Sequence, residues 1–157
     1  MHTIYITSPN ERPDFRLVVA FLWRDGQNVD TEGDSHHPAS RTWTELYVQN
    51  RENKDEVVEV SQYQQSPLVL RIESEQQYLA ARVAFFLATY CNAGVSSEPD
   101  SEFHRPESLQ PLVGDDFSTA AALKRVAQSP YSHSSFDNPF PNLDRESLLK
   151  AKAALGL

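Results

Sequence analysis

The sequence predicts an α+β fold in which an antiparallel sheet of about five strands packs on a helix, with two further short C-terminal helices. Two observations predict this arrangement. Apolar and polar residues alternate in short segments up to residue 73, which is the period of strands, whereas after residue 74 apolar residues recur every three or four positions, which is the period of a helix. A chain of 157 residues suits one domain, so we expect residues 1–157 to fold together.

The N-terminal segments predict two strands and a loop. Residues 3–7 alternate around two isoleucines, and prolines then bracket a turn. Residues 15–24 carry apolar side chains at both odd and even positions, which favours a strand covered on both sides. Residues 25–40 are rich in Gly, Asp, Asn, Ser, Glu and His, so we expect a mobile loop.

Two further strands, residues 42–50 and 56–64, can pair in one favoured register. If Val48 lies opposite Val58 and Leu46 opposite Val60, one face is uniformly aliphatic, whereas a slip of one residue would mix buried Val with exposed Glu. The other face then collects Trp43, Glu45, Tyr47, Glu59, Ser61 and Tyr63. We therefore expect this in-register hairpin.

The best-defined helix follows a fifth strand, which Pro67 introduces and which spans residues 68–73. Ser74 can accept a hydrogen bond from an amide two or three residues on, and Gln77 stands where a capping box has Glu or Gln. We expect the helix at about residues 75–92, with Gly94 as a left-handed stop. Its apolar stripe is Leu79, Val83, Phe86, Leu87 and Tyr90.

The C-terminal part predicts an acidic loop and two short helices. Residues 95–117 are rich in Pro, Ser and acids, and we expect little order there. Ser118 can cap a helix that runs to about Gln128, and Asp144 can cap a last helix that runs to Leu155. Between them, aromatic residues are expected to hold an irregular segment, residues 129–142, against the body.

Charge and composition exclude several classes of protein. Lys and Arg number 14 against 22 Asp and Glu, a formal net charge of −8, which repels nucleic acid and anionic lipid and attracts cationic partners. The longest apolar run, from Leu17 to Trp23, falls well short of the ~20 residues of a membrane-spanning helix. The single cysteine, Cys91, cannot form an internal disulfide and suits the reducing cytosol, where we expect the protein to reside.

No catalytic, metal-binding or cofactor-binding motif stands out. Cys91 lies in an apolar helical run, where a buried, inert thiol is expected, and the adjacent His36 and His37 lack zinc-site spacing. With five glycines in the chain there is no phosphate loop, dinucleotide fingerprint or nucleophile elbow. We therefore expect no enzyme and no cofactor. Two alternatives remain: a small hydrolase or metal-dependent enzyme that uses His104, His133, Asp115 and Asp116, and an adaptor subunit of a larger assembly.

Two features favour protein binding. An acidic loop could occupy a basic groove on a partner through Glu98, Asp100, Glu102, Asp115 and Asp116. The polar sheet face carries Trp43, Tyr47 and Tyr63, and exposed aromatic residues ringed by charge are typical interface anchors. The alternative is that a C-terminal helix covers this face and the rings belong to the core.

The middle third of the chain resembles small bacterial immunity proteins of polymorphic or type VI toxin systems. The resemblance rests on the strand Leu68-Val-Leu-Arg-Ile-Glu-Ser74, which follows a strand meander, and on the helix Leu79-Ala-Ala-Arg-Val-Ala-Phe-Phe-Leu87. It implies a non-enzymatic cytosolic inhibitor that binds a cognate protein toxin and covers its active site. The acidity of the chain agrees with a toxin that has a cationic groove.

Overall fold

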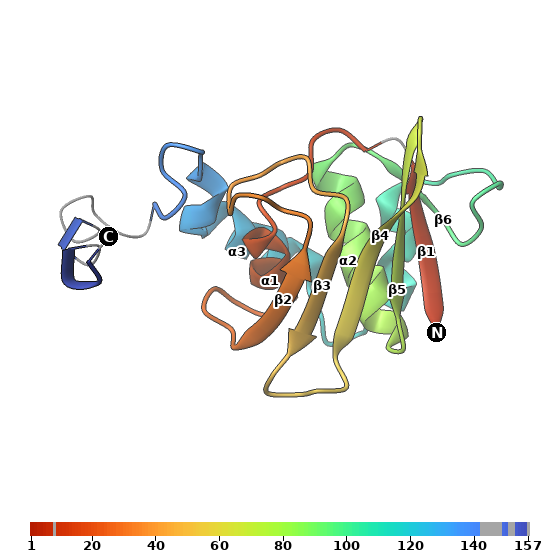
Figure 1. The fold of residues 1–157 in the computed structure, drawn as a ribbon. Coiled ribbons are helices and arrows are strands. Elements are labelled where there is room, and N and C mark those ends of the chain that lie inside the picture. The colour runs from red at the N-terminus through yellow and green to blue at the C-terminus, as the bar shows by residue number, and fades with distance from the viewer. Residues whose placement is uncertain (8, 142–148, 151–152, 157) are drawn as a thin grey trace.

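A six-stranded antiparallel sheet with its helices on one face makes up the fold of the computed structural model (Figure 1). The model describes residues 1–7, 9–141, 149–150 and 153–156. The strand order is β2-β3-β4-β5-β1-β6, so a meander of four strands is joined to β1, and β6 closes the far edge. The strands are β1 (His2–Thr7), β2 (Val29–Gly33), β3 (Leu46–Asn50), β4 (Val57–Gln65), β5 (Leu68–Ser74) and β6 (Gly94–Ser96).

The predicted α+β fold is confirmed, and so is the register of the central hairpin. Strands β1, β3, β4 and β5 correspond to four predicted strands. Val48 pairs with Val58 and Leu46 with Val60, as the aliphatic pattern requires. These four side chains point into the core, where each is at most 5% exposed.

Helix α2 (Gln77–Tyr90) lies across the inner face of the sheet and contacts β1, β4, β5 and β6. Four of its five predicted stripe residues are fully buried, and Tyr90 is exposed instead. The predicted cap is only partly correct. Ser74 Oγ does accept from the N–H of Gln76 at 3.1 Å, but Ser74 ends β5, and the helix begins after Gln76.

The chain leaves α2 through Asn92 and not through Gly94. Asn92 has the positive φ of 53° that a left-handed helix stop needs, and asparagine tolerates it better than most residues. Gly94 is the first residue of β6. A Cβ there would lie 3.0 Å from Cβ of Phe103 and 3.2 Å from the carbonyl oxygen of His104, so glycine is needed for close packing.

The predicted strand at residues 15–24 is wrong, because this segment forms helix α1 (Arg16–Leu22). Six of its seven residues are buried, since α1 packs against α2 and against α3 (Thr119–Gln128). A short helix that is buried all round carries no 3.6-residue period, and its pattern cannot be distinguished from that of a buried strand. The ring of Phe21 stacks on that of Phe86 at 4.8 Å.

The predicted loop at residues 25–40 contains the edge strand β2. Its backbone pairs with β3, with Thr31 opposite Val48 and Glu32 opposite Tyr47. Strand β2 carries almost no apolar residues, because an edge strand at the margin of the core needs few. The sequence pattern therefore gave no sign of it.

The acidic segment, residues 95–117, is more ordered than predicted. It contains the last two residues of β6 and a 3₁₀ helix, η1 (Pro106–Leu112), whose Leu109 is buried. The predicted cap of α3 is confirmed, since Ser118 Oγ accepts from the N–H of Ala121 at 3.1 Å. Of the last predicted helix, residues 149–150 and 153–154 are helical, Leu155 lies in a turn, and residues 144–148 and 151–152 lie outside the described residues.

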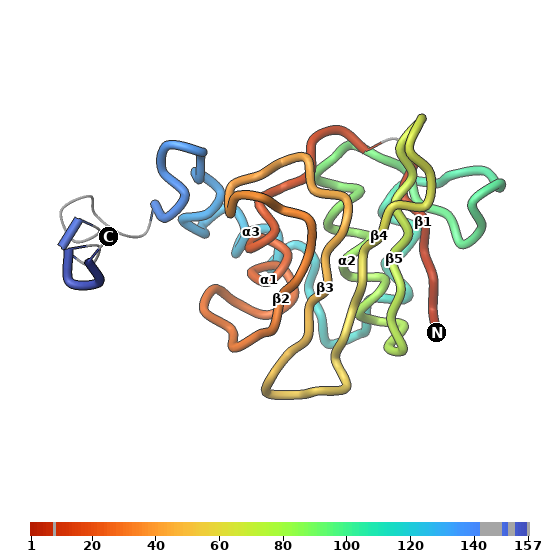
Figure 2. Tube along the Cα trace, in the orientation of Figure 1, coloured from red at the N-terminus to blue at the C-terminus, as the bar shows by residue number. Residues whose placement is uncertain are grey.

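Residues 129–140 form a segment that lies beside the start of α1, as the blue tube in Figure 2 shows. We call this segment the strap. It begins with the short 3₁₀ helix η2 (Pro130–His133). The carboxylate of Asp14, which is fully buried, accepts from Ser134 Oγ at 2.6 Å and from Arg16 Nη2 at 2.6 Å. Arg16 also stacks over the ring of Tyr131 and donates to Pro139 O, so one ion pair joins the strap to α1.

Candidate functional site

No helix in the described part of the chain up to residue 141 covers the outer face of the sheet, and we regard this face as the candidate site. Helices α1, α2 and α3 all lie behind the sheet in the view of Figure 1. Because side chains alternate along a strand, the residues between the buried ones point away from the helices. The bare face therefore consists of the outward positions of strands that the core holds in place.

One row of side chains crosses this face and is strongly acidic. The pairings place Glu32 opposite Tyr47, Tyr47 opposite Glu59, Glu59 opposite Glu73 and Glu73 opposite Thr3. The row thus runs across β2, β3, β4, β5 and β1. Like charges directly opposite each other in a sheet are destabilising, so the pair Glu59 and Glu73 costs stability.

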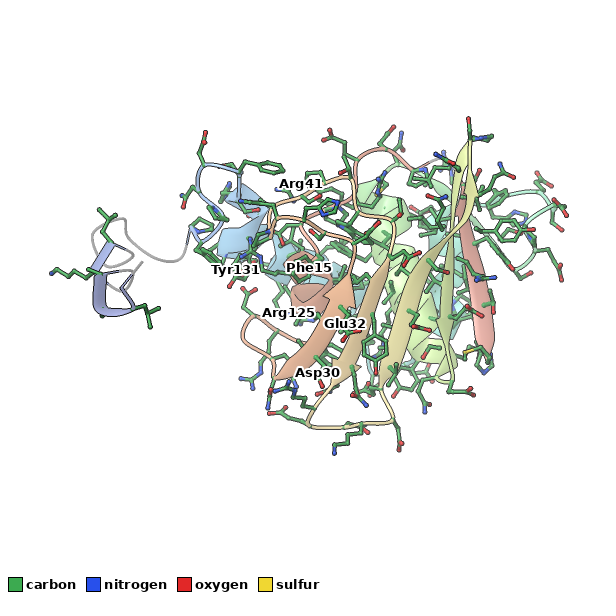
Figure 3. All side chains as sticks on the ribbon, in the orientation of Figure 1. Phe15, Asp30, Glu32, Arg41, Arg125 and Tyr131 are labelled. Carbon is green, nitrogen blue, oxygen red and sulfur yellow. The ribbon has the colours of Figure 1, made fainter. Side chains whose placement is uncertain are left out.

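A shallow groove of about 680 Å³ follows the acidic row. Its charged lining consists of five carboxylates and one guanidinium: Glu32, Asp34, Glu45, Glu59, Glu73 and Arg71. Tyr47 and Ser61 also line it. Figure 3 shows Glu32 and Asp30 on β2 at the margin of the sheet. The groove is thus an open surface with a large excess of negative charge.

Three of the groove carboxylates, those of Glu32, Glu45 and Glu59, have no cationic partner among the described residues. The other two are engaged. Glu73 pairs with Arg71 at 3.2 Å. Asp34 accepts hydrogen bonds from the backbone N–H groups of Thr44 and Glu45 and from the Thr44 hydroxyl. The free carboxylates are therefore available to a ligand.

The hydrogen bonds to Asp34 also favour its charged form. Partial burial by itself raises the pKa of this carboxyl group. The hydrogen bonds from Thr44 and Glu45 outweigh that effect, and the pKa ends below its ordinary value. Asp34 therefore stays ionised and ties the end of β2 to the segment that leads into β3.

Two of the three predicted aromatic anchors lie on or beside the bare face. Tyr47 is half-buried in the acidic row, and Tyr63 is 43% exposed. Tyr63 lies at a β-bulge in β4, where the register shifts between Gln62 and Gln64. Its ring meets that of Tyr5 edge-on, with centroids 5.1 Å apart. Rigid, partly exposed rings of this kind suit contact with another protein.

The third predicted anchor, Trp43, is buried, so the prediction that its ring is exposed is wrong. Its side chain is 1% exposed, and its Nε1 donates to the carbonyl oxygen of Pro13 at 2.7 Å. Trp43 precedes β3 and is therefore outside the alternation that orients the strand residues. The alternation begins only at Leu46, so it does not orient Trp43.

The predicted acidic loop is divided into two places. Glu98, Asp100 and Glu102 are exposed and follow β6, at the far edge of the sheet from β2. Asp115 and Asp116 follow η1 and lie on the helix side, where Asp116 Oδ1 is 3.8 Å from Nη2 of Arg82 in α2. The five acids therefore do not form one continuous run.

A second charged pocket, of about 360 Å³, lies beside Arg82. Burial lowers the pKa of Arg82, partly offset by the charge of Asp116. Its guanidinium stacks on Phe117 at 4.1 Å and donates to Val113 O. Glu56, on the other wall, accepts from the hydroxyl of Tyr78 at 3.1 Å. The charges of this pocket are thus engaged with one another.

The residues of the alternative enzyme site are not brought together. The segment after β6, which holds His104, and the strap, which holds His133, lie on opposite sides of the molecule (Figure 2). Among the described residues, no group of three or more His, Cys, Asp or Glu could hold a metal ion. His37 instead stacks on Phe136, with centroids 4.4 Å apart.

Sequence reasoning found part of the bare face and missed the rest. It found Tyr47, Glu59 and Tyr63 because they alternate with buried residues in the predicted hairpin. It misses Glu32 because β2 has the composition of a loop, and it misses the opposition of Glu59 and Glu73 because the sequence pattern does not set the register of β5 against β4. Arg71 and Glu73 alternate with apolar residues in β5, and this pattern is the signal that extends the predicted polar face to that strand.

Comparison with known protein families, curated proteins and solved structures gives no match for this chain. No helix in the described part of the chain is long and apolar enough to span a membrane.

Proposed function

We propose that this protein is a non-enzymatic cytosolic inhibitor of the immunity type, which binds a cationic protein toxin through the bare face of its sheet. The observation that carries the proposal is the acidic row. Its carboxylates stand on a face that no helix α1–α3 covers, and Glu59 opposes Glu73 at a cost in stability. Residues that lower stability without a structural gain are expected at functional sites.

The chemistry of the face fits a protein partner with a basic groove. Unpaired carboxylates attract a cationic partner and speed its association, whereas the tyrosines contribute buried contact area once the complex forms. Glu98, Asp100 and Glu102 extend the negative potential beyond β6 and act in steering. Asp115 and Asp116 lie beside α2 and have no direct contact in this proposal.

The test uses Glu59→Lys, because this variant separates binding from folding. It replaces a repulsive cross-strand pair by an attractive one, so the free energy of unfolding should rise by about 0.2–1 kcal/mol. Binding to the product of the adjacent gene should weaken, mainly through slower association, and the dependence of association on salt should become shallower. Urea denaturation and surface plasmon resonance measure the two effects.

Glu107→Lys is the matched control. The substitution Glu107→Lys changes the net charge by the same amount as Glu59→Lys. Glu107 is exposed in η1 and lies outside the groove. The association rate of the Glu107→Lys variant should stay close to that of the parent protein. If both variants slow association equally, only net charge matters and the sheet face is not the docking surface. If neither does, the charge-steered complex is ruled out.

A further inference from the structure

A cavity of about 270 Å³ adjoins the groove where β2 ends. Its lining is Phe15, Thr31, Glu32, Gly33, Ser35, Trp43, Glu45 and Leu46. Trp43 and Leu46 are buried and Phe15 is half-buried, whereas Glu32 and Glu45 are exposed. The cavity therefore combines polar and apolar lining, in which the ring of Phe15 is half-buried and two carboxylates are exposed (Figure 3 labels Phe15 and Glu32).

The size of the cavity suits one side chain. Pockets for drug-sized ligands begin at about 300 Å³, so this cavity falls just below that class. Its wall is fixed by backbone. A Cβ on Gly33 would lie 2.3 Å from the carbonyl oxygen of Glu45, which shows how closely the two chain segments approach there. A preformed wall lowers the ordering cost of binding.

The chemistry of the lining suits a cationic side chain. Long basic side chains have an apolar stem that packs on rings and aliphatic groups, and a charged head that stays near water. Glu32 and Glu45 have no cationic partner among the described residues, so they can accept such a head. A planar guanidinium can offer N–H groups to two carboxylates and also stack on aromatic rings, which an ammonium group does less well.

We propose that this cavity receives one arginine side chain of the protein partner. The inference rests on the proposed function, since it names the anchor by which a cationic protein would be held on the bare face. The stem of the arginine lies against the half-buried ring of Phe15, and the guanidinium pairs with Glu32 and Glu45. The acidic row then steers the partner, and this cavity fixes its position.

Protection of the sheet edge explains why β2 carries charged residues, but it does not explain the cavity beside them. Charged residues on an edge strand prevent edge-to-edge aggregation, and Asp30 and Glu32 on β2 serve that purpose. Asp30 is already paired with Arg51, whereas Glu32 is not paired. Protection of an edge requires neither a cavity behind Glu32 nor a second carboxylate from Glu45, outside the strand.

The test is a titration of the ¹⁵N-labelled full chain with N-acetyl-arginine amide, followed by NMR. The indole N–H of Trp43 and the amide of Gly33 should shift in a saturable manner. N-acetyl-lysine amide should bind more weakly, and the neutral analogue N-acetyl-citrulline amide should cause no saturable shift. The double variant Glu32→Gln/Glu45→Gln should lose at least about tenfold in affinity for the arginine probe, or roughly 1.4 kcal/mol.

The control variant Asp55→Asn/Glu107→Gln changes the net charge equally and should bind the probe like the parent protein, since both residues are exposed and lie outside the cavity. Equal shifts with the arginine and citrulline probes would overturn the proposal, as would equal affinity for arginine and lysine.

The two proposals fail separately. If an octalysine peptide shifts the amides of β3 to β5 but the arginine probe leaves Trp43 and Gly33 unchanged, the bare face binds cations and the arginine pocket is wrong. If only the arginine probe binds, the pocket stands and the docking face is wrong.

Discussion

Asp14 is a fully buried carboxylate that, among the described residues, accepts hydrogen bonds from Arg16 and Ser134. Removing one partner of a buried ion pair leaves the other charge uncompensated. We expect Asp14→Asn to lower the free energy of unfolding by about 3 kcal/mol, measured by urea denaturation. Ser134→Ala, which removes a single neutral donor, should cost only about 1 kcal/mol. Equal losses in the two variants would mean that the charge of Asp14 contributes nothing.

Cys91 is a buried thiol, and its predicted inertness can be tested by its chemistry. Burial raises the pKa of the Cys91 thiol to about 12, partly offset by the positive charge of Arg12. In the folded protein at pH 8 a disulfide reagent should react roughly a thousandfold more slowly than with the same chain in denaturant, because the thiolate is the nucleophile.

The same pKa shift links Cys91 to stability at high pH. The unfolded thiol ionises near its ordinary pKa of 9.0, whereas the folded thiol stays protonated up to about pH 12. The unfolded state therefore loses a proton first, and stability should fall as pH rises across that window. Cys91→Ala should show a shallower fall. Rapid labelling of the native chain at pH 8 would contradict the buried, protonated thiol.

At the scale of elements, the end of α1 depends on a residue that lies 104 positions after Phe21 in the chain. Arg125 Nε donates to Ala20 O at 2.8 Å and its Nη2 donates to Phe21 O at 2.7 Å, so α3 caps the last turn of α1. Those carbonyls have no partner within the helix, and a cation there also complements the helix dipole.

We therefore expect Arg125→Ala to lower the free energy of unfolding by roughly 2 kcal/mol, since bonds to a charged group contribute about 1.5–3 kcal/mol. The neighbouring exposed residue provides the control, because Lys124→Ala should change stability by less than about 0.5 kcal/mol. Thermal and urea denaturation measure both. A null effect of Arg125→Ala would show that water replaces the guanidinium at the end of α1.

The elements that the sequence predicts correctly are those with a clear period or cap. Residues 57–90 alternate and then repeat every three or four positions, because that sheet and helix each have one buried face. Helix α1 is buried on all sides and β2 on almost none, so neither has a pattern that identifies it. The bare face was found only where it lies within the predicted hairpin.

At the scale of the molecule, the excess of eight negative charges has opposite effects on stability and on binding. Repulsion among the carboxylates opposes the compact state, and salt screens it. Raising NaCl should therefore increase the free energy of unfolding, by on the order of 1 kcal/mol or less, while it slows association with a cationic partner. Urea denaturation and association rates at two salt concentrations measure the pair of effects. Loss of stability with added salt would instead mean that attractive ion pairs dominate.

The one-sided covering of the sheet has a consequence for how such a protein can change over generations. Alternate residues of β3, β4 and β5 lie in the core, while their neighbours lie on the bare face. A substitution at an outward position therefore changes the surface and leaves the packing of the core as it is. The bare face can thus diversify stepwise while the architecture beneath it stays intact.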